Sequence, residues 1–149
     1  MSTGSSAGRR WRSVGVALSL DVVLVVAFAA IGRASHDSDV WAGLWQTAWP
    51  FLVGLGLGWL VTLAWRAPMA PVRTGLGVWA VTVAGGMLLR ALTGQGIAVA
   101  FIVVAAVTLL VALVGWRVVA AVVRRARSRR APTGAGLSVR SLRTTRGPG

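Results

Sequence analysis

Four long apolar runs constrain the fold of this chain more than any other feature of its sequence. A helix needs about 20 apolar residues, within a range of about 17 to 25, to cross the hydrocarbon core of a bilayer. The runs cover residues 14–31, 48–65, 76–92 and 97–123, and the fourth is longer than one crossing requires. We therefore predict an all-α, polytopic membrane protein. Its four transmembrane helices, at about residues 14–31, 48–65, 76–92 and 97–116, form a bundle within a transmembrane domain of residues 14–123.

The overall composition excludes a soluble domain and many kinds of enzyme. Hydrophobic residues make up 56% of the chain and charged residues only 13%, whereas charged residues are about 25% of an average soluble domain. The chain has no Cys, Lys, Glu or Tyr. This removes thiolate nucleophiles, Schiff-base lysines and Glu-based general acids. We predict that the protein is not an enzyme and that it holds no cofactor and no metal.

The positions of arginine indicate which way the helices cross the membrane. Of 16 Arg, 14 lie in residues 9–12, 66–73 and 117–146, which flank the runs on one side only. Because cytoplasmic segments carry the excess of positive charge, we expect both termini to be cytoplasmic. The use of Arg in place of Lys, with abundant Ala, Gly and Val, is typical of a G+C-rich bacterial genome. We therefore expect a multi-pass protein of the bacterial cytoplasmic membrane.

The two ends of the chain differ from its apolar centre. Both are rich in Gly, Ser and Thr, so we predict a disordered N-terminus at residues 1–13 and a basic disordered tail at residues 124–149. An alternative for the N-terminus is a twin-arginine signal peptide, because Arg9 and Arg10 precede the first run. We favour a transmembrane helix, because the run exceeds the about 7–15 residues of a signal core and three more runs follow.

Asp21 is the one carboxyl group expected inside the membrane. A rise of about 1.5 Å per residue places it roughly 10 Å above the inner end of its run, at the depth of one polar side chain on each other helix. We propose a polar cluster inside the bundle that comprises Asp21, Trp59, Thr82 and Thr108. The alternative is that each Thr bonds a carbonyl of its own helix and that Trp59 faces lipid.

Three polar residues, Arg33, His36 and Arg90, are predicted to lie at the outer face. Arg90 lies about 10 Å farther along its helix than the depth of Asp21, which is too far for direct pairing. We expect its side chain to extend towards the outer headgroups, or to pair with Asp37 or Asp39. The Ser, His and Asp residues near His36 are too few and too close in sequence for a catalytic triad or a metal site.

Small residues and terminal charges indicate what the helices contact. Four glycines, two of them in a G-x-x-x-G spacing, are predicted to allow close helix packing: Gly54, Gly58, Gly85 and Gly86. Self-association through the first two is the alternative. Five Arg beyond the fourth run are predicted to contact anionic lipid: Arg124, Arg125, Arg127, Arg129 and Arg130. They lack the interleaved aromatic residues of a nucleic-acid site. Most Trp, Trp116 among them, lie at predicted interfaces, which is typical of membrane anchors.

Several segments carry a resemblance to a known family. They are Ala29-Ala30-Ile31-Gly32-Arg33 with His36, Trp49-Pro50-Phe51 with Gly54 and Gly58-Trp59, Gly86-Met87-Leu88-Leu89-Arg90, and Phe101-Ile102-Val103-Val104-Ala105 with Gly115-Trp116-Arg117. Over roughly residues 14–120 the chain resembles a family of small four-helix bacterial membrane proteins, which is catalogued as a domain of unknown function. The resemblance implies the fold and the location and transfers no catalytic residue.

Two classes of function are consistent with the sequence. The first is a non-enzymatic accessory or structural component of the membrane, which is favoured because so few polar groups lie inside the apolar runs. The second is a small oligomeric channel or proton-linked transporter, in which Asp21 titrates and Arg90 lies near the outer mouth. The expected partner is the lipid bilayer, including its anionic lipids, and not nucleic acid. A homo-oligomer or a membrane partner protein is left open.

Overall fold

The computed structural model describes residues 4–34 and 40–130, and this part of the chain is helical with short connections. Four long helices form a bundle: α1 (Gly4–Ala34), α2 (Val40–Val61), α3 (Gly77–Leu92) and α4 (Val99–Arg130). A short 3-10 helix, η1 (Ala64–Arg66), and a π-helical turn, η2 (Pro71–Leu76), connect α2 to α3. Four segments are long and apolar enough to cross a membrane: Ala7–Arg33, Gly43–Val61, Pro71–Leu92 and Val99–Arg130. The predicted all-α fold with four spans is confirmed, and the chain has the architecture of a multi-pass membrane protein.

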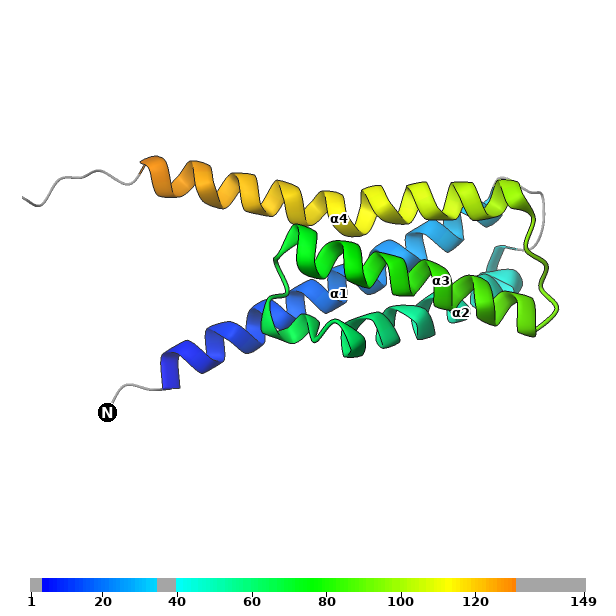
Figure 1. The fold of residues 1–149 in the computed structure, drawn as a ribbon, viewed down its shortest axis with the longest axis horizontal. Helices are drawn as coiled ribbons and strands as arrows, with labels where there is room; N and C mark the ends of the chain where they lie inside the picture. The colour runs from blue at the N-terminus through cyan, green and yellow to red at the C-terminus, as the bar shows by residue number, and fades with distance from the viewer. Residues whose placement is uncertain (1–3, 35–39, 131–149) are drawn as a thin grey trace, which may run out of the picture.

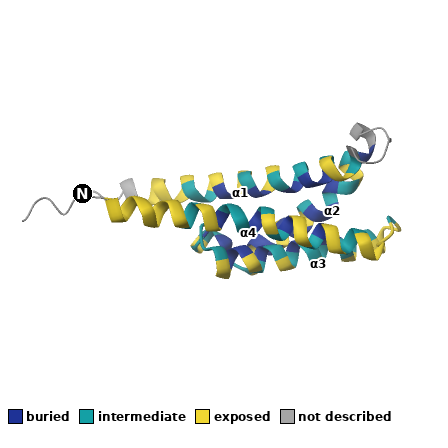
Figure 2. Cartoon of the chain, turned by 90° about the horizontal axis from the view of Figure 1, so that it is seen from above, coloured by how far each residue is buried: buried dark blue, intermediate teal, exposed yellow. Residues whose placement is uncertain are grey.

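Of the two longest helices, α1 begins and α4 ends at the same end of the bundle. The start of α1, the α2–α3 connection and the end of α4 lie together there, whereas the end of α1, the start of α2 and the α3–α4 connection lie at the opposite end (Figure 1). With 31 and 32 residues, α1 and α4 are each about 46–48 Å long, which exceeds the roughly 30 Å hydrocarbon core. Their ends therefore project beyond the other helices, and residues 7–12 and 122–130 are exposed (Figure 2).

These projecting ends correct the predicted boundaries of disorder. Residues 4–13 and 124–130, which we expected in a disordered terminus and a disordered tail, are helical. The low apolar content of these segments favours disorder. They are helical because adding a residue to a helix that is already formed avoids the cost of nucleation. The rest of the two predicted disordered segments, residues 1–3 and 131–149, lies outside the described residues.

The buried core runs along the bundle between the four helices. An aromatic group from three helices fills the end remote from the chain termini, and the Phe28 and Phe51 rings meet edge to face with centroids 5.4 Å apart. Leu55, Leu109 and Leu113 continue the core towards the other end. The outward faces carry exposed aliphatic side chains along the helices, which is the surface that a bilayer favours.

The predicted small residues lie where α2 and α3 meet. A Cβ atom on Gly54 would lie 2.7 Å from the carbonyl oxygen of Thr82, and one on Gly58 would lie 3.0 Å from that of Val78. A Cβ atom on Gly86 would lie 2.5 Å from the ring of Phe51, and one on Gly85 would lie 3.3 Å from the Gly54 Cα. The G-x-x-x-G face is therefore covered by α3 and is not the exposed face that self-association would use.

Candidate functional site

A buried ion pair joins the first helix to the last. Asp21 on α1 and Arg117 on α4 are both 0% exposed. The Arg117 Nη2 donates to Asp21 Oδ2 at 2.7 Å and Nη1 donates to Oδ1 at 2.8 Å. The pairing is bidentate, which is the strongest geometry available to a guanidinium and a carboxylate. This contact fixes the rotation and the axial position of α4 against α1.

Two tryptophan side chains complete the hydrogen bonding of the carboxylate. The Trp59 Nε1, from α2, donates to Asp21 Oδ2 at 2.9 Å, and the Trp116 Nε1, from α4, donates to Oδ1 at 2.9 Å. Each carboxylate oxygen thus accepts one bond from the guanidinium and one from an indole. A carboxylate offers about four acceptor positions, so the acceptor capacity of Asp21 is filled.

Arg117 also bonds the backbone of two different segments. Its Nε donates to the Pro68 carbonyl at 3.0 Å, and its Nη1 donates to the Leu113 carbonyl one helical turn earlier at 2.7 Å. The guanidinium carbon lies 4.5 Å from the centre of the Trp116 ring, within the range of a cation–π contact. We call Asp21, Trp59, Trp116 and Arg117 the Asp21 network. With the Pro68 carbonyl, it links α1, α2, α4 and the α2–α3 connection.

Local sequence explains why these groups meet. On α4, Leu109, Leu113 and Arg117 recur every fourth residue and are all buried, so Arg117 continues the inward face of the helix. The α2–α3 connection, whose Pro68 carbonyl accepts the bond from the Arg117 Nε, is stabilised by Thr74. The Thr74 Oγ1 donates to the Ala67 carbonyl at 2.7 Å. A Cβ atom on Gly75 would lie 3.3 Å from the Cδ of Arg117, so a glycine there gives the arginine stem room.

The four residues of the predicted polar cluster have different surroundings. The structure brings Trp59 to Asp21, as described above. Thr82 is fully buried, but its hydroxyl has no hydrogen-bond partner among the described residues. Thr108 is exposed on α4, so its assignment to the cluster was wrong. The depth count ignored helical phase: Thr108 precedes Arg117 by nine residues, which is about 180° around the helix.

The prediction missed the two residues that matter most beside Asp21. Arg117 was placed at the inner boundary of the fourth span, and Trp116 was treated as a membrane anchor. One signal in the sequence pointed to them. The apolar run continues from Arg117 to residue 123, so that arginine lies within an apolar helix and, like Asp21, needs a buried partner.

Of the residues predicted for the outer face, Arg33 and Arg90 lie at the end of the bundle opposite the start of α1 and the end of α4 (Figure 1). The Arg90 side chain donates to Gln95 Oε1 at 3.0 Å and to the Gln95 and Gly96 carbonyls, and its guanidinium carbon lies 4.4 Å from the centre of the Phe101 ring. Arg90 therefore links the end of α3 to the connection between α3 and α4. The Arg33 guanidinium lies against Gly43 on α2. His36, Asp37 and Asp39 lie outside the described residues.

The remaining predicted positions concern charge and metals. The five Arg predicted to contact lipid lie on the exposed end of α4. In the described ranges, no group of three or more His, Cys, Asp or Glu residues is placed to hold a metal ion.

The comparisons with known proteins identify a family and leave the activity open. A family model described as a protein of unknown function (DUF3054) matches residues 18–120 of the chain. That range contains every member of the Asp21 network. No curated protein and no solved structure matches the chain.

Proposed function

This chain belongs to the DUF3054 family, described as being of unknown function, and we propose that it is a non-enzymatic structural or accessory component of the bacterial cytoplasmic membrane. In this proposal the Asp21 network is a permanent clamp. It fixes how the outer helices α1 and α4 sit on the α2–α3 pair. Asp21 stays paired with Arg117, and it carries no proton across the membrane.

The saturation of the Asp21 carboxylate is the observation that supports a clamp. Its two oxygens accept four charged or indole hydrogen bonds from three side chains, and its charge is balanced by a fully buried arginine. A proton carrier must release such bonds in each cycle, and leaving a buried charge without its partner costs about 3–5 kcal/mol. A carboxylate held in this way is better suited to stabilising the bundle than to repeated cycles of proton transfer.

The charge distribution supports the proposed orientation. Among the described residues, Arg9 and Arg10 belong to the start of α1, Arg66 to the α2–α3 connection, and the arginines beyond Arg117 to the end of α4. These three segments lie together at one end of the bundle (Figure 1). Arg33 and Arg90 belong to the opposite end. By the positive-inside rule, the arginine-rich end faces the cytoplasm.

A pair of variants tests the clamp directly. Asp21→Asn leaves Arg117 buried without a counter-charge, so we expect it to lower the free energy of unfolding by about 3–5 kcal/mol. Asp21→Asn/Arg117→Gln removes both charges, and we expect it to regain part of that loss. Unfolding in detergent, followed by circular dichroism, measures both changes.

A flux measurement on the same proteins distinguishes a clamp from a transporter. In liposomes loaded with a pH-sensitive dye, we expect the wild type and the doubly neutral variant to leak protons at the rate of protein-free liposomes. Proton flux that exceeds this background in the wild type and disappears in the folded double variant would overturn the proposal. It would instead favour the proton-linked transporter.

A further inference from the structure

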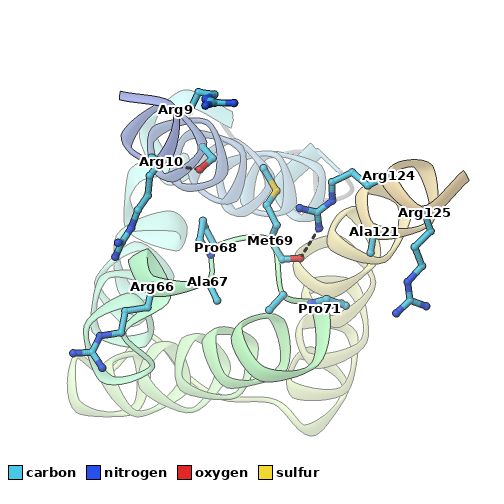
Figure 3. Close-up of a pocket in the computed structure, with 12 residues that line it drawn as sticks. Arg9, Arg10, Arg66, Ala67, Pro68, Met69, Pro71, Ala121, Arg124 and Arg125 are labelled. Atoms are coloured by element: carbon cyan, nitrogen blue, oxygen red, sulfur yellow. Dashed lines mark hydrogen bonds between the residues drawn. The ribbon is translucent and has the colours of Figure 1, made fainter. Parts of the chain in front are cut away.

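A pocket of about 900 Å³ lies at the arginine-rich end of the bundle. The start of α1, the α2–α3 connection and the end of α4 surround it (Figure 3). Five of its lining side chains are arginines that come from these three segments: Arg9, Arg10, Arg66, Arg124 and Arg125. Arg10 and Arg66 lie on one side of the connection, and Arg124 and Arg125 lie on the other (Figure 3).

The residues that line this pocket supply positive charge and no negative charge. None of the residues that line it is acidic. Asp21, the one carboxylate in the described part of the chain, is already bonded to Arg117. Like charges repel one another, and an anion bound between these segments would offset that repulsion. A planar guanidinium matches the oxygens of a phosphate group, which it binds through two parallel hydrogen bonds.

The floor of the pocket is apolar and has a fixed backbone. It is made by the side chains of residues 67–71 and Ala121. The Ala70 amide donates to the Ala67 carbonyl at 3.1 Å, and the Gly75 amide donates to the Ala70 carbonyl at 3.0 Å. Leu63, which begins the turn out of α2, has a φ of 50°. This left-handed conformation is unfavourable for leucine and persists only where the surroundings enforce it.

The same floor connects the pocket to the Asp21 network. Arg124 turns inward, and its Nη2 donates to the Met69 carbonyl at 3.4 Å (Figure 3). Arg117 donates to the adjacent Pro68 carbonyl. Two arginines of α4 thus bond two neighbouring carbonyls of the connection. The pocket is a built feature, formed by three segments, and differs from a charged tail that hangs free in solvent.

The level of the pocket in the membrane indicates the kind of anion that it accepts. Its arginines adjoin the apolar helices: Arg10 precedes the apolar part of α1, Arg66 follows α2, and Arg124 follows the apolar part of α4. They lie where an apolar helix meets water, which is the level of lipid headgroups. An amphiphile could place its phosphate among the arginines and its glycerol and first methylenes on the apolar floor.

We infer that this pocket binds the phosphate group of an anionic phospholipid. The inference extends the predicted contact between the α4 arginines and lipid, because it assigns one defined site to residues from three segments. It does not depend on whether the Asp21 network is a clamp.

Lipid retention measures this binding. The wild type is purified from nanodiscs that contain equal parts of phosphatidylglycerol and phosphatidylcholine, and native mass spectrometry counts the lipids that remain bound. We expect retention of phosphatidylglycerol over phosphatidylcholine. We also expect Arg10→Gln/Arg66→Gln/Arg124→Gln to weaken that retention by at least about tenfold, because each arginine near an anionic lipid contributes severalfold to affinity. Arg10→Gln/Arg66→Gln, which keeps Arg124 on its carbonyl, is a milder variant in case the triple variant does not fold.

A matched control separates a site from general attraction. Arg127→Gln/Arg129→Gln/Arg130→Gln changes the net charge equally, at residues that do not line the pocket, and should reduce retention clearly less than the triple variant in the pocket does. An equal loss in both triple variants, or no preference in the wild type, would overturn the inference. Inorganic phosphate is the second probe: if it binds the wild type while phosphatidylglycerol does not, the lipid assignment is wrong.

Discussion

At the scale of single residues, the Asp21 network shows that a polar group in a membrane helix is understood through its partners. The depth of Asp21 and Trp59 could be estimated from the sequence, because helical rise is constant. The partner Arg117 could not be found in this way, because the depth count says nothing about which face of α4 turns inward. The assignment of Thr108 to the polar cluster was wrong for the same reason. Depth needs to be combined with helical phase, and phase is weakly encoded when a helix is apolar on every side.

The two indole donors give a prediction at this scale. Trp59→Phe and Trp116→Phe each keep an aromatic ring but remove one hydrogen bond to the Asp21 carboxylate. We expect each to lower the free energy of unfolding by about 1.5–3 kcal/mol, the range for bonds to charged groups. Trp45→Phe, at a side chain that is 69% exposed, is the control and should have little effect. Equal stability of all three variants in a detergent unfolding series would exclude the indoles as structural donors.

At the scale of helices, a close helix contact of α2 could be predicted from the sequence, but its partner α3 could not. The G-x-x-x-G spacing indicated a close approach, yet it did not identify α3 as the partner. Thr82 and Val78 meet Gly54 and Gly58 because the spacing of four residues repeats on both helices. The sequence of α2 alone offers this face equally to another copy of the chain, and only the assembled bundle shows that α3 already covers it.

Two alanine substitutions on α2 test this contact with opposite expected signs. Gly54→Ala places a Cβ atom 2.7 Å from the Thr82 carbonyl, so we expect a loss of about 1–3 kcal/mol through overpacking. Gly56→Ala meets nothing within 4 Å and should be neutral or stabilising by up to about 1 kcal/mol, because alanine favours a helix. Thermal unfolding of both variants measures the difference. Similar melting temperatures would show that the α2–α3 approach is looser than described.

At the scale of the whole molecule, the sequence predicts the fold because the strongest signals in this chain are collective. Four apolar runs predict four helices, and arginines gathered at one end predict a common side for both termini.

The orientation can be tested because the chain has no Cys, so single cysteines can be introduced without background. Ser128 lies on the exposed end of α4, and Thr93 is exposed at the opposite end of the bundle. If the arginine-rich end is cytoplasmic, a membrane-impermeant maleimide should label Thr93→Cys in intact spheroplasts. Ser128→Cys should react only after the membrane is permeabilised. The reverse pattern would place both termini outside, and the arginines of the pocket would then face the outer leaflet.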